Sequence, residues 1–149
     1  MSGPIGALFG RGIGGLPPAT PLDFAALRLP PSPNTCLAAP PGGHAQAHIT
    51  VPPLPVDAAT AWPALRALGD GLPRVFRYGE WPERRQAQWV ARTPLMNYPD
   101  IVTAELVPGP AGAGLFLYSR SLFGWSDLGV NRRRVEAWLA ALEAALRRR

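Results

Sequence analysis

The sequence predicts an α+β fold, in which an antiparallel sheet of about five strands carries two helices on one face, in the order β-α-β-β-β-β-α. Apolar and polar residues alternate with period two through much of residues 74–121, as they do in strands with one buried face. Apolar residues recur at helical spacing before and after that stretch, in residues 60–71 and 131–147. A chain of 149 residues is also long enough for one domain with its own core.

The first 32 residues are predicted to form a flexible arm, and residues 33–149 a single domain. The arm is rich in glycine and then in proline, so it has little apolar surface with which to order itself. The stretch "PLDFAALRL" is the exception, because Phe24 and its neighbouring leucines could hold the arm on the domain. The alternative for the glycine-rich start is weak contact with a membrane surface. No stretch of the sequence is long and apolar enough to predict a transmembrane helix.

The domain is predicted to open with a short edge strand and a helix. The strand covers residues 49–51, where two prolines stop a β-branched run. The helix is predicted to begin with Thr60 as its N-cap, because this choice puts Pro63 in the first turn, where proline is tolerated. Either Gly69 or Gly71 is predicted to end it.

Four further strands and a second helix are predicted to follow. The strands are expected at residues 74–81, 86–93, 100–108 and 114–121. In the second of them, Gln86, Gln88 and Arg92 are predicted to lie on the wetter face of the sheet. The fourth is apolar on both faces up to Tyr118, which predicts a central position. The final helix has an apolar stripe made of Val135, Trp138, Leu139, Leu142 and Leu146.

The composition narrows the classes of partner. The net charge is +5, yet all 15 basic residues are arginine, and alanine, proline and glycine are also abundant. That combination is typical of a GC-rich bacterial genome, so we do not expect a nucleic-acid partner; weak nucleic-acid binding through the arginines is the alternative. Cys36, His44 and His48 lie in a proline- and glycine-rich stretch without a nearby carboxylate, so no metal site and no cofactor are expected. The chain is predicted to be a soluble, cytoplasmic monomer.

The segment "LYSRSLFGWSDLGVNRRR" is predicted to hold the functional site, where a strand runs through a loop into the last helix. Asn131 is predicted to be the N-cap of that helix. Three arginines follow in its first turn, where each exposed positive charge costs about 0.3–1 kcal/mol. Two interpretations stay open: a clamp between Asp127 and an arginine that fixes the loop, or a binding site. The candidate binding residues are Asp100, Ser119, Arg120, Ser121, Asp127, Asn131, Arg132 and Arg134.

The same segment resembles the C-terminal signature of the family called domain of unknown function 1499. The residues that carry the resemblance are Ser119, Ser121, Gly124, Ser126, Asp127, Gly129, Asn131, Arg132 and Arg134. Weaker similarity lies upstream, at Pro33–Asn34 and at Tyr98–Asp100, and implies a family domain over about residues 33–147. The chain departs from the pattern at Tyr118 and Leu122, where the family has arginines. Arg120 lies on the same strand face as these two positions.

The function predicted from the sequence is a non-catalytic binding or interaction module, with a polar site at the junction of residues 119–134. Its partner would be an unidentified protein or a small anionic ligand. The alternative is an enzyme of unknown reaction that uses Arg120, Asp127 and Asp100. We do not expect an enzyme, because the sequence contains no nucleophile–base pair and no phosphate-binding loop.

Overall fold

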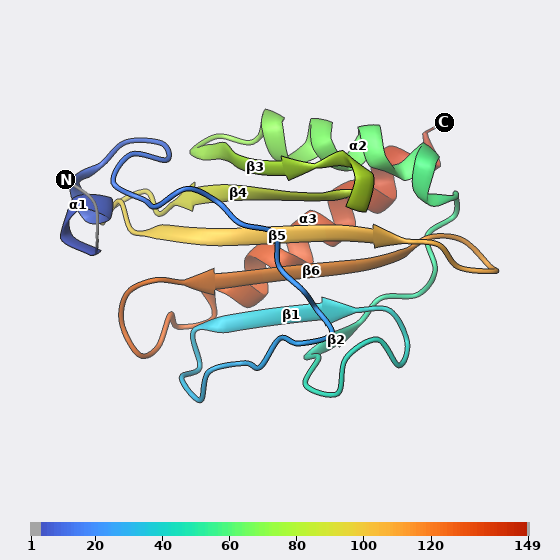
Figure 1. The fold of residues 1–149 in the computed structure, drawn as a ribbon, viewed down its shortest axis with the longest axis horizontal. Coiled ribbons are helices and arrows are strands. Elements are labelled where there is room, and N and C mark those ends of the chain that lie inside the picture. Colours follow the sequence, from blue (N-terminus) through green and yellow to red (C-terminus); the bar gives the residue numbers. More distant parts are fainter. Residues whose placement is uncertain (1–3, 149) are drawn as a thin grey trace.

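The computed structural model describes residues 4–148, as one mixed sheet of six strands with three helices (Figure 1). The strands are β1 (Thr35–Ala39), β2 (Ile49–Thr50), β3 (Val75–Trp81), β4 (Gln86–Arg92), β5 (Pro99–Val107) and β6 (Gly114–Ser121). The helices are α1 (Pro4–Phe9), α2 (Ala58–Gly71) and α3 (Val130–Arg147), and a 3-10 turn η1 (Pro82–Arg84) joins β3 to β4. The strand order is β2-β1-β6-β5-β4-β3, so β6 is central, as predicted.

The α+β class is confirmed, but the predicted count and pairing are wrong in detail. The sheet has six strands, because β1 was not predicted, and it is mixed, because β1 and β2 run parallel. The pairs from β3 to β6 are antiparallel, as the alternation indicated. A third helix, α1, lies in the N-terminal segment.

Helices α2 and α3 pack on one face of the sheet and form the main core there. Trp89 of β4 and Trp138 of α3 meet edge to face, with ring centroids 5.3 Å apart. Gly69 lets α2 approach this pair closely, because a Cβ atom at Gly69 would lie 2.2 Å from Cε2 of Trp89. The glycine that was predicted only as a helix terminator therefore has a packing role.

The predicted start of α2 is wrong by three residues. Asp57 is the N-cap, and its Oδ1 atom accepts a hydrogen bond of 2.8 Å from the backbone N–H of Thr60. Pro63 consequently lies inside the helix rather than in its first turn. Thr60, which was predicted to be the N-cap, instead lies in the first turn and donates its backbone N–H to Asp57.

The N-terminal arm lies along the opposite face of the sheet, where Figure 1 shows it crossing in front of β5 and β6. Phe24 is buried there and stacks on Phe116 of β6, with ring centroids 4.8 Å apart. Leu37 and Tyr118 belong to the same apolar cluster. The stretch around Phe24 therefore packs on the domain, while the flexibility of residues 1–32 stays a prediction.

Polar side chains of the sheet and of its turns hold the arm by its main-chain carbonyl groups. The guanidinium of Arg92 donates to the carbonyls of Ala7, Gly12 and Gly14. The other donor–carbonyl pairs are Asn97 to Leu8 and Gly10, Tyr78 to Pro17, Gln88 to Thr20, and Gln86 and Arg84 to Leu22. The prediction of a wetter face is wrong for Gln86, Gln88 and Arg92, which the arm buries. Within residues 4–148, no helix is long and apolar enough to cross a bilayer.

Candidate functional site

The predicted site residues fall on two opposite faces of the sheet. Strand alternation directs Ser119 and Ser121 of β6 toward α3, on the face of Leu117. Arg120, between the two serines, lines cavities on the face that the arm covers. Arg120 therefore does not face Asp127 across the loop, and the predicted grouping of the two is wrong.

Asn131 is the centre of a buried polar network on the helix face. Its side chain is inaccessible to solvent and lies in the first turn of α3, so it is not the N-cap that was predicted. Its Nδ2 atom donates to the carbonyl of Asn34, to Oγ of Ser121 and to Oδ2 of Asp127, and its Oδ1 atom accepts from Ser119 and Arg134. This one side chain thus ties α3 to β6 and to the segment before β1.

Asp127 takes the capping role that was predicted for Asn131. Its two carboxylate oxygens accept from the backbone N–H groups of Gly129, at 2.7 Å, and of Asn131, at 3.0 Å. Burial would raise the pKa of Asp127, but the hydrogen bonds from Asn131 and Gly129 outweigh it and hold the pKa below its ordinary value. No arginine pairs with Asp127 among the described residues, so the predicted Asp127–arginine clamp is wrong.

The buried ion pair of the network joins Asp100 to Arg134. Nη1 of Arg134 lies 2.8 Å from Oδ2 of Asp100, and only 2% of the Asp100 side chain is exposed. Burial raises the pKa of Asp100, and the neighbouring Arg134 charge only partly offsets this. None of the described cavities is lined by Asp100, so this carboxyl group joins strand to helix and is closed to a ligand.

Arg132 and Arg133 lie outside this network. Arg132 is half-exposed and makes a loose pair with Glu136, at 3.7 Å. Arg133 is exposed and donates to the carbonyl of Leu128, at 3.0 Å. Of the three arginines that open α3, only Arg134 joins the buried residues of the signature.

A groove between the arm and the sheet surrounds Arg120. Three cavities of about 530, 330 and 220 Å³ share Arg120 in their walls. The floor of the groove comes from β3, β5, β6 and the residue that follows β6, and the arm supplies one wall. The floor residues are Tyr78, Ile101, Thr103, Tyr118 and Leu122, and the arm wall includes Leu16, Pro17, Leu22, Leu27 and Arg28. We call this space the Arg120 groove.

The charge in the Arg120 groove is positive. Arg120 and Arg28 both line the largest cavity, and no Asp or Glu lines any of the three. No described carboxylate lies within ion-pair distance of Arg120. Burial raises the pKa of Tyr78 and Tyr118, and the charge of Arg120 acts in the opposite direction on both.

Sequence reasoning found Arg120 but missed the residues around it in the groove. Arg28, Tyr78 and the arm prolines come from segments far from residues 119–134. One signal was present: the two positions at which the resembled family has arginines, Tyr118 and Leu122, line the largest cavity with Arg120. Period-two alternation within β6 could have separated this set from Ser119, whereas Ser121, whose hydroxyl bonds Asn131, also borders the largest cavity.

Cys36, His44 and His48 lie near the site, since Cys36 pairs with Ser119 across β1 and β6, but their surroundings do not activate them for chemistry. Cys36 is buried, and burial raises the pKa of its thiol, which is the reverse of what activates a cysteine nucleophile. Nδ1 of His48 accepts from the backbone N–H of Leu37, and His44 bonds the carbonyl of Leu27. The described part of the chain contains no group of three potential metal ligands.

The arginines do not gather into one basic face. Arg84 lies at the turn between β3 and β4, whereas Arg132 lies at the start of α3 and Arg147 at its end. Figure 1 shows the β3–β4 turn and the start of α3 toward opposite ends of the sheet. A continuous arginine track of the kind that binds a nucleic-acid backbone is therefore not formed by these residues.

Comparison with known proteins gives a family and a fold. The X-ray crystal structure of protein MLL2253 from Mesorhizobium loti is similar over 76% of this chain and 97% of that one, with a TM-score of 0.53 and 13% sequence identity. At that identity the likeness concerns the fold alone. The search of curated proteins found no match to the chain. The family described as "Protein of unknown function (DUF1499)" matches residues 27–142, which include β1 to β6 and most of α3. The chain therefore belongs to the DUF1499 family.

Proposed function

We propose that this chain is a non-catalytic binding module whose ligand occupies the Arg120 groove. The observation that carries the proposal is the position of Arg120: one guanidinium, without a carboxylate partner among the described residues, forms part of three adjoining cavities. An unpaired arginine in a partly apolar groove favours an anionic group, which it can hold by paired hydrogen bonds.

The shape of the groove indicates the class of ligand. The cavity of about 530 Å³ has two cationic side chains, Arg28 and Arg120, together with hydroxyl and amide groups. The cavity of about 330 Å³ is lined mainly by apolar groups, among them Leu16, Ile101 and Phe123. A ligand that fits both has an anionic head, such as a carboxylate or a phosphate, and an apolar body of moderate length.

The network around Asn131 has a supporting role in this proposal. It fixes β6 against α3, and thereby fixes the strand from which Arg120 projects in the opposite direction. The polar junction at residues 119–134 thus positions the site, while the ligand binds on the other face. The alternative of catalysis by Asp100 and Asp127 has less support, because Asp100 is buried in an ion pair and Asp127 is occupied by backbone N–H groups.

The test is calorimetric titration of the full chain with four ligands that share one alkyl chain: dodecanoate, dodecyl phosphate, dodecanol and dodecyltrimethylammonium. Each is used below its critical micelle concentration. We expect saturable binding of the two anions and weaker or no binding of the alcohol and the cation. Arg120→Gln should weaken binding of the anions about tenfold or more, because it removes a charge-assisted hydrogen bond.

The matched control is Arg147→Gln, which removes the same charge from the end of α3. It should leave the affinity for the anions within about twofold of the wild type, because Arg147 is exposed and lies outside the groove. Equal affinities of the wild type and Arg120→Gln for both anions would contradict the proposal. So would the absence of saturable binding.

A further inference from the structure

The exposed large apolar side chains of the described residues gather at one end of the molecule. They belong to the arm, to the start of β3, to the turn between β4 and β5, and to the loop between β6 and α3. They are Phe9, Ile13, Phe76, Leu95, Met96, Tyr98, Trp125 and Leu128. Four of them are more than 60% exposed: Leu95 at 91%, Leu128 at 85%, Phe9 at 76% and Trp125 at 65%. We call this set the apolar end.

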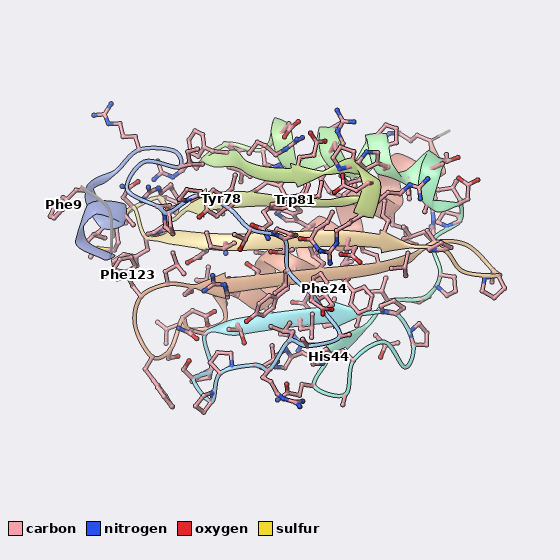
Figure 2. All side chains as sticks on the ribbon, in the orientation of Figure 1. Phe9, Phe24, His44, Tyr78, Trp81 and Phe123 are labelled. Carbon is pink, nitrogen blue, oxygen red and sulfur yellow. The ribbon has the colours of Figure 1, made fainter. Side chains whose placement is uncertain are left out.

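The segments of the apolar end contact one another directly. The Nδ2 atom of Asn97, in the β4–β5 turn, donates to the carbonyls of Leu8 and Gly10 in the arm. Tyr98 of the same turn stacks on Phe123 of the β6–α3 loop, with ring centroids 5.8 Å apart. Figure 1 shows α1, the β4–β5 turn and the β6–α3 loop together at one end of the sheet, and Figure 2 shows Phe9 and Phe123 there. The apolar end is thus one surface made by several loops.

Exposed arginines belong to the segments that form this surface or lie next to them in the chain. Arg11, Arg132 and Arg133 are exposed on the arm and at the start of α3, close in the chain to the apolar residues. The same segments hold two acidic residues: Asp23, farther along the arm, and Asp127, whose two oxygens accept hydrogen bonds from backbone N–H groups. Of the three arginines, Arg132 also makes a loose pair with Glu136. The apolar end therefore combines exposed aromatic and leucine side chains with an excess of arginine.

From this combination we infer that the apolar end is a docking surface for an anionic lipid bilayer. Apolar side chains at loop tips enter the boundary between headgroups and acyl chains, where tryptophan is especially favourable. Arginines beside them attract the anionic headgroups. Exposed apolar side chains that gather on one surface mark interaction sites, and the arginines of these segments complement an anionic membrane. This inference uses other residues than the proposed ligand site, although Ala7 and Phe123 of the Arg120 groove belong to the same segments.

The test is flotation of the full chain with two kinds of vesicle: phosphatidylcholine alone, and phosphatidylcholine mixed equally with phosphatidylglycerol. We expect the wild type to float with the mixed vesicles, to float far less with the neutral ones, and to be released by high salt. The double substitution Leu95→Ser and Trp125→Ser should lower the partition coefficient about tenfold or more. Both side chains are largely exposed, so the variant should melt at the temperature of the wild type.

Matched charge variants distinguish docking from general attraction. Arg11→Gln with Arg133→Gln removes two charges at the apolar end, and Arg147→Gln with Arg148→Gln removes two at the far end of α3. Only the first pair should weaken flotation. Equal losses for the two pairs would overturn the inference in favour of adsorption by net charge. Absence of flotation would also overturn the inference. If the wild type then self-associates and the double substitution Leu95→Ser with Trp125→Ser abolishes this, the surface is a contact between copies of this chain.

Discussion

A single oxygen atom, Oδ2 of Asp127, accepts hydrogen bonds from both the backbone N–H and the side-chain amide of Asn131, at 3.0 and 2.7 Å. The carboxylate thereby orients the side chain that holds α3 against β6. It also satisfies backbone donors that the helix itself leaves free. An aspartate therefore suits the position before the helix because it accepts hydrogen bonds from N–H groups there, and not because it pairs with an arginine.

Replacing Asp127 by alanine should therefore destabilise the domain. We expect Asp127→Ala to lower the free energy of unfolding by about 1–3 kcal/mol, because two backbone donors and the amide of Asn131 lose their acceptor. Urea denaturation followed by tryptophan fluorescence measures this. The control is Ser126→Ala, which removes a neighbouring hydroxyl group. This hydroxyl accepts one long hydrogen bond, of 3.3 Å, from the backbone N–H of Leu128, so its loss should lower the free energy of unfolding much less. An Asp127→Ala variant as stable as the wild type would contradict the capping role.

The stabilisation by Asp127 should depend on pH. The pKa of Asp127 in the folded chain is below its ordinary value of 3.8, so the ionised carboxyl group stabilises the fold. That contribution is fully present above the ordinary value and is lost as the pH falls through the lower, folded-state value. The difference in unfolding free energy between the wild type and Asp127→Ala should accordingly shrink below about pH 4. If the difference grows as the pH falls, the pKa of Asp127 is raised on folding and not lowered.

Removing one partner of the Asp100–Arg134 pair should lower the free energy of unfolding more than removing both partners. Asp100→Ala leaves a buried arginine without its counter-charge, which costs about 3–5 kcal/mol in comparable cases. The double substitution of Asp100→Leu with Arg134→Met should cost less, because no charge is stranded. Arg132→Ala is the exposed control and should change stability by less than about 1 kcal/mol. Chemical denaturation of the three variants tests this order.

The two glycines at the end of α2 should respond in opposite ways to substitution by alanine. A Cβ atom at Gly69 would meet the ring of Trp89 at 2.2 Å, so Gly69→Ala should destabilise the domain by about 1–3 kcal/mol. A Cβ atom at Gly71 would meet nothing within 4 Å, so Gly71→Ala should be neutral or slightly stabilising. Thermal melting of the pair is the measurement, and equal melting temperatures would contradict the close packing of Gly69 on Trp89.

Arg92 should hold the arm on the sheet. Arg92→Met keeps much of the side-chain volume but removes the donors to the carbonyls of Ala7, Gly12 and Gly14. Backbone amides in residues 7–22 should then exchange with solvent faster by tenfold or more, while those of β4 to β6 remain protected. Hydrogen exchange read by mass spectrometry measures both regions. Unchanged exchange in the arm would mean that Phe24 and the other arm contacts hold it without Arg92.

The sequence predicted the parts of the fold whose signal is local. The stripe of α3 and the alternation of β4 and β5 repeat within single elements, and these elements form as predicted. Strand β1 was missed because "TCLAA" has no alternation. Its side chains are buried on both faces, Cys36 toward the helices and Leu37 under the arm.

The candidate site was predicted only in part, for a related reason. Proximity in the sequence grouped Arg120 with Asp127, although a strand sends consecutive side chains to opposite faces. The capping role was given to Asn131, because asparagine and aspartate both cap helices and the sequence alone does not say where the loop ends. The arm wall of the groove could not be predicted from the sequence, since it meets the three strands through long-range contacts.

The central claim, that the ligand binds on the face of Arg120, is tested most directly by mapping where a ligand binds. Nuclear magnetic resonance of the isotope-labelled full chain, titrated with dodecanoate, reports this residue by residue. We expect saturable shift changes at Arg28, Tyr118, Arg120 and Leu122, and small changes at Asn131 and Arg134. Shift changes centred on Asp127, Asn131 and Arg134, or none at Arg120 at saturation, would contradict it.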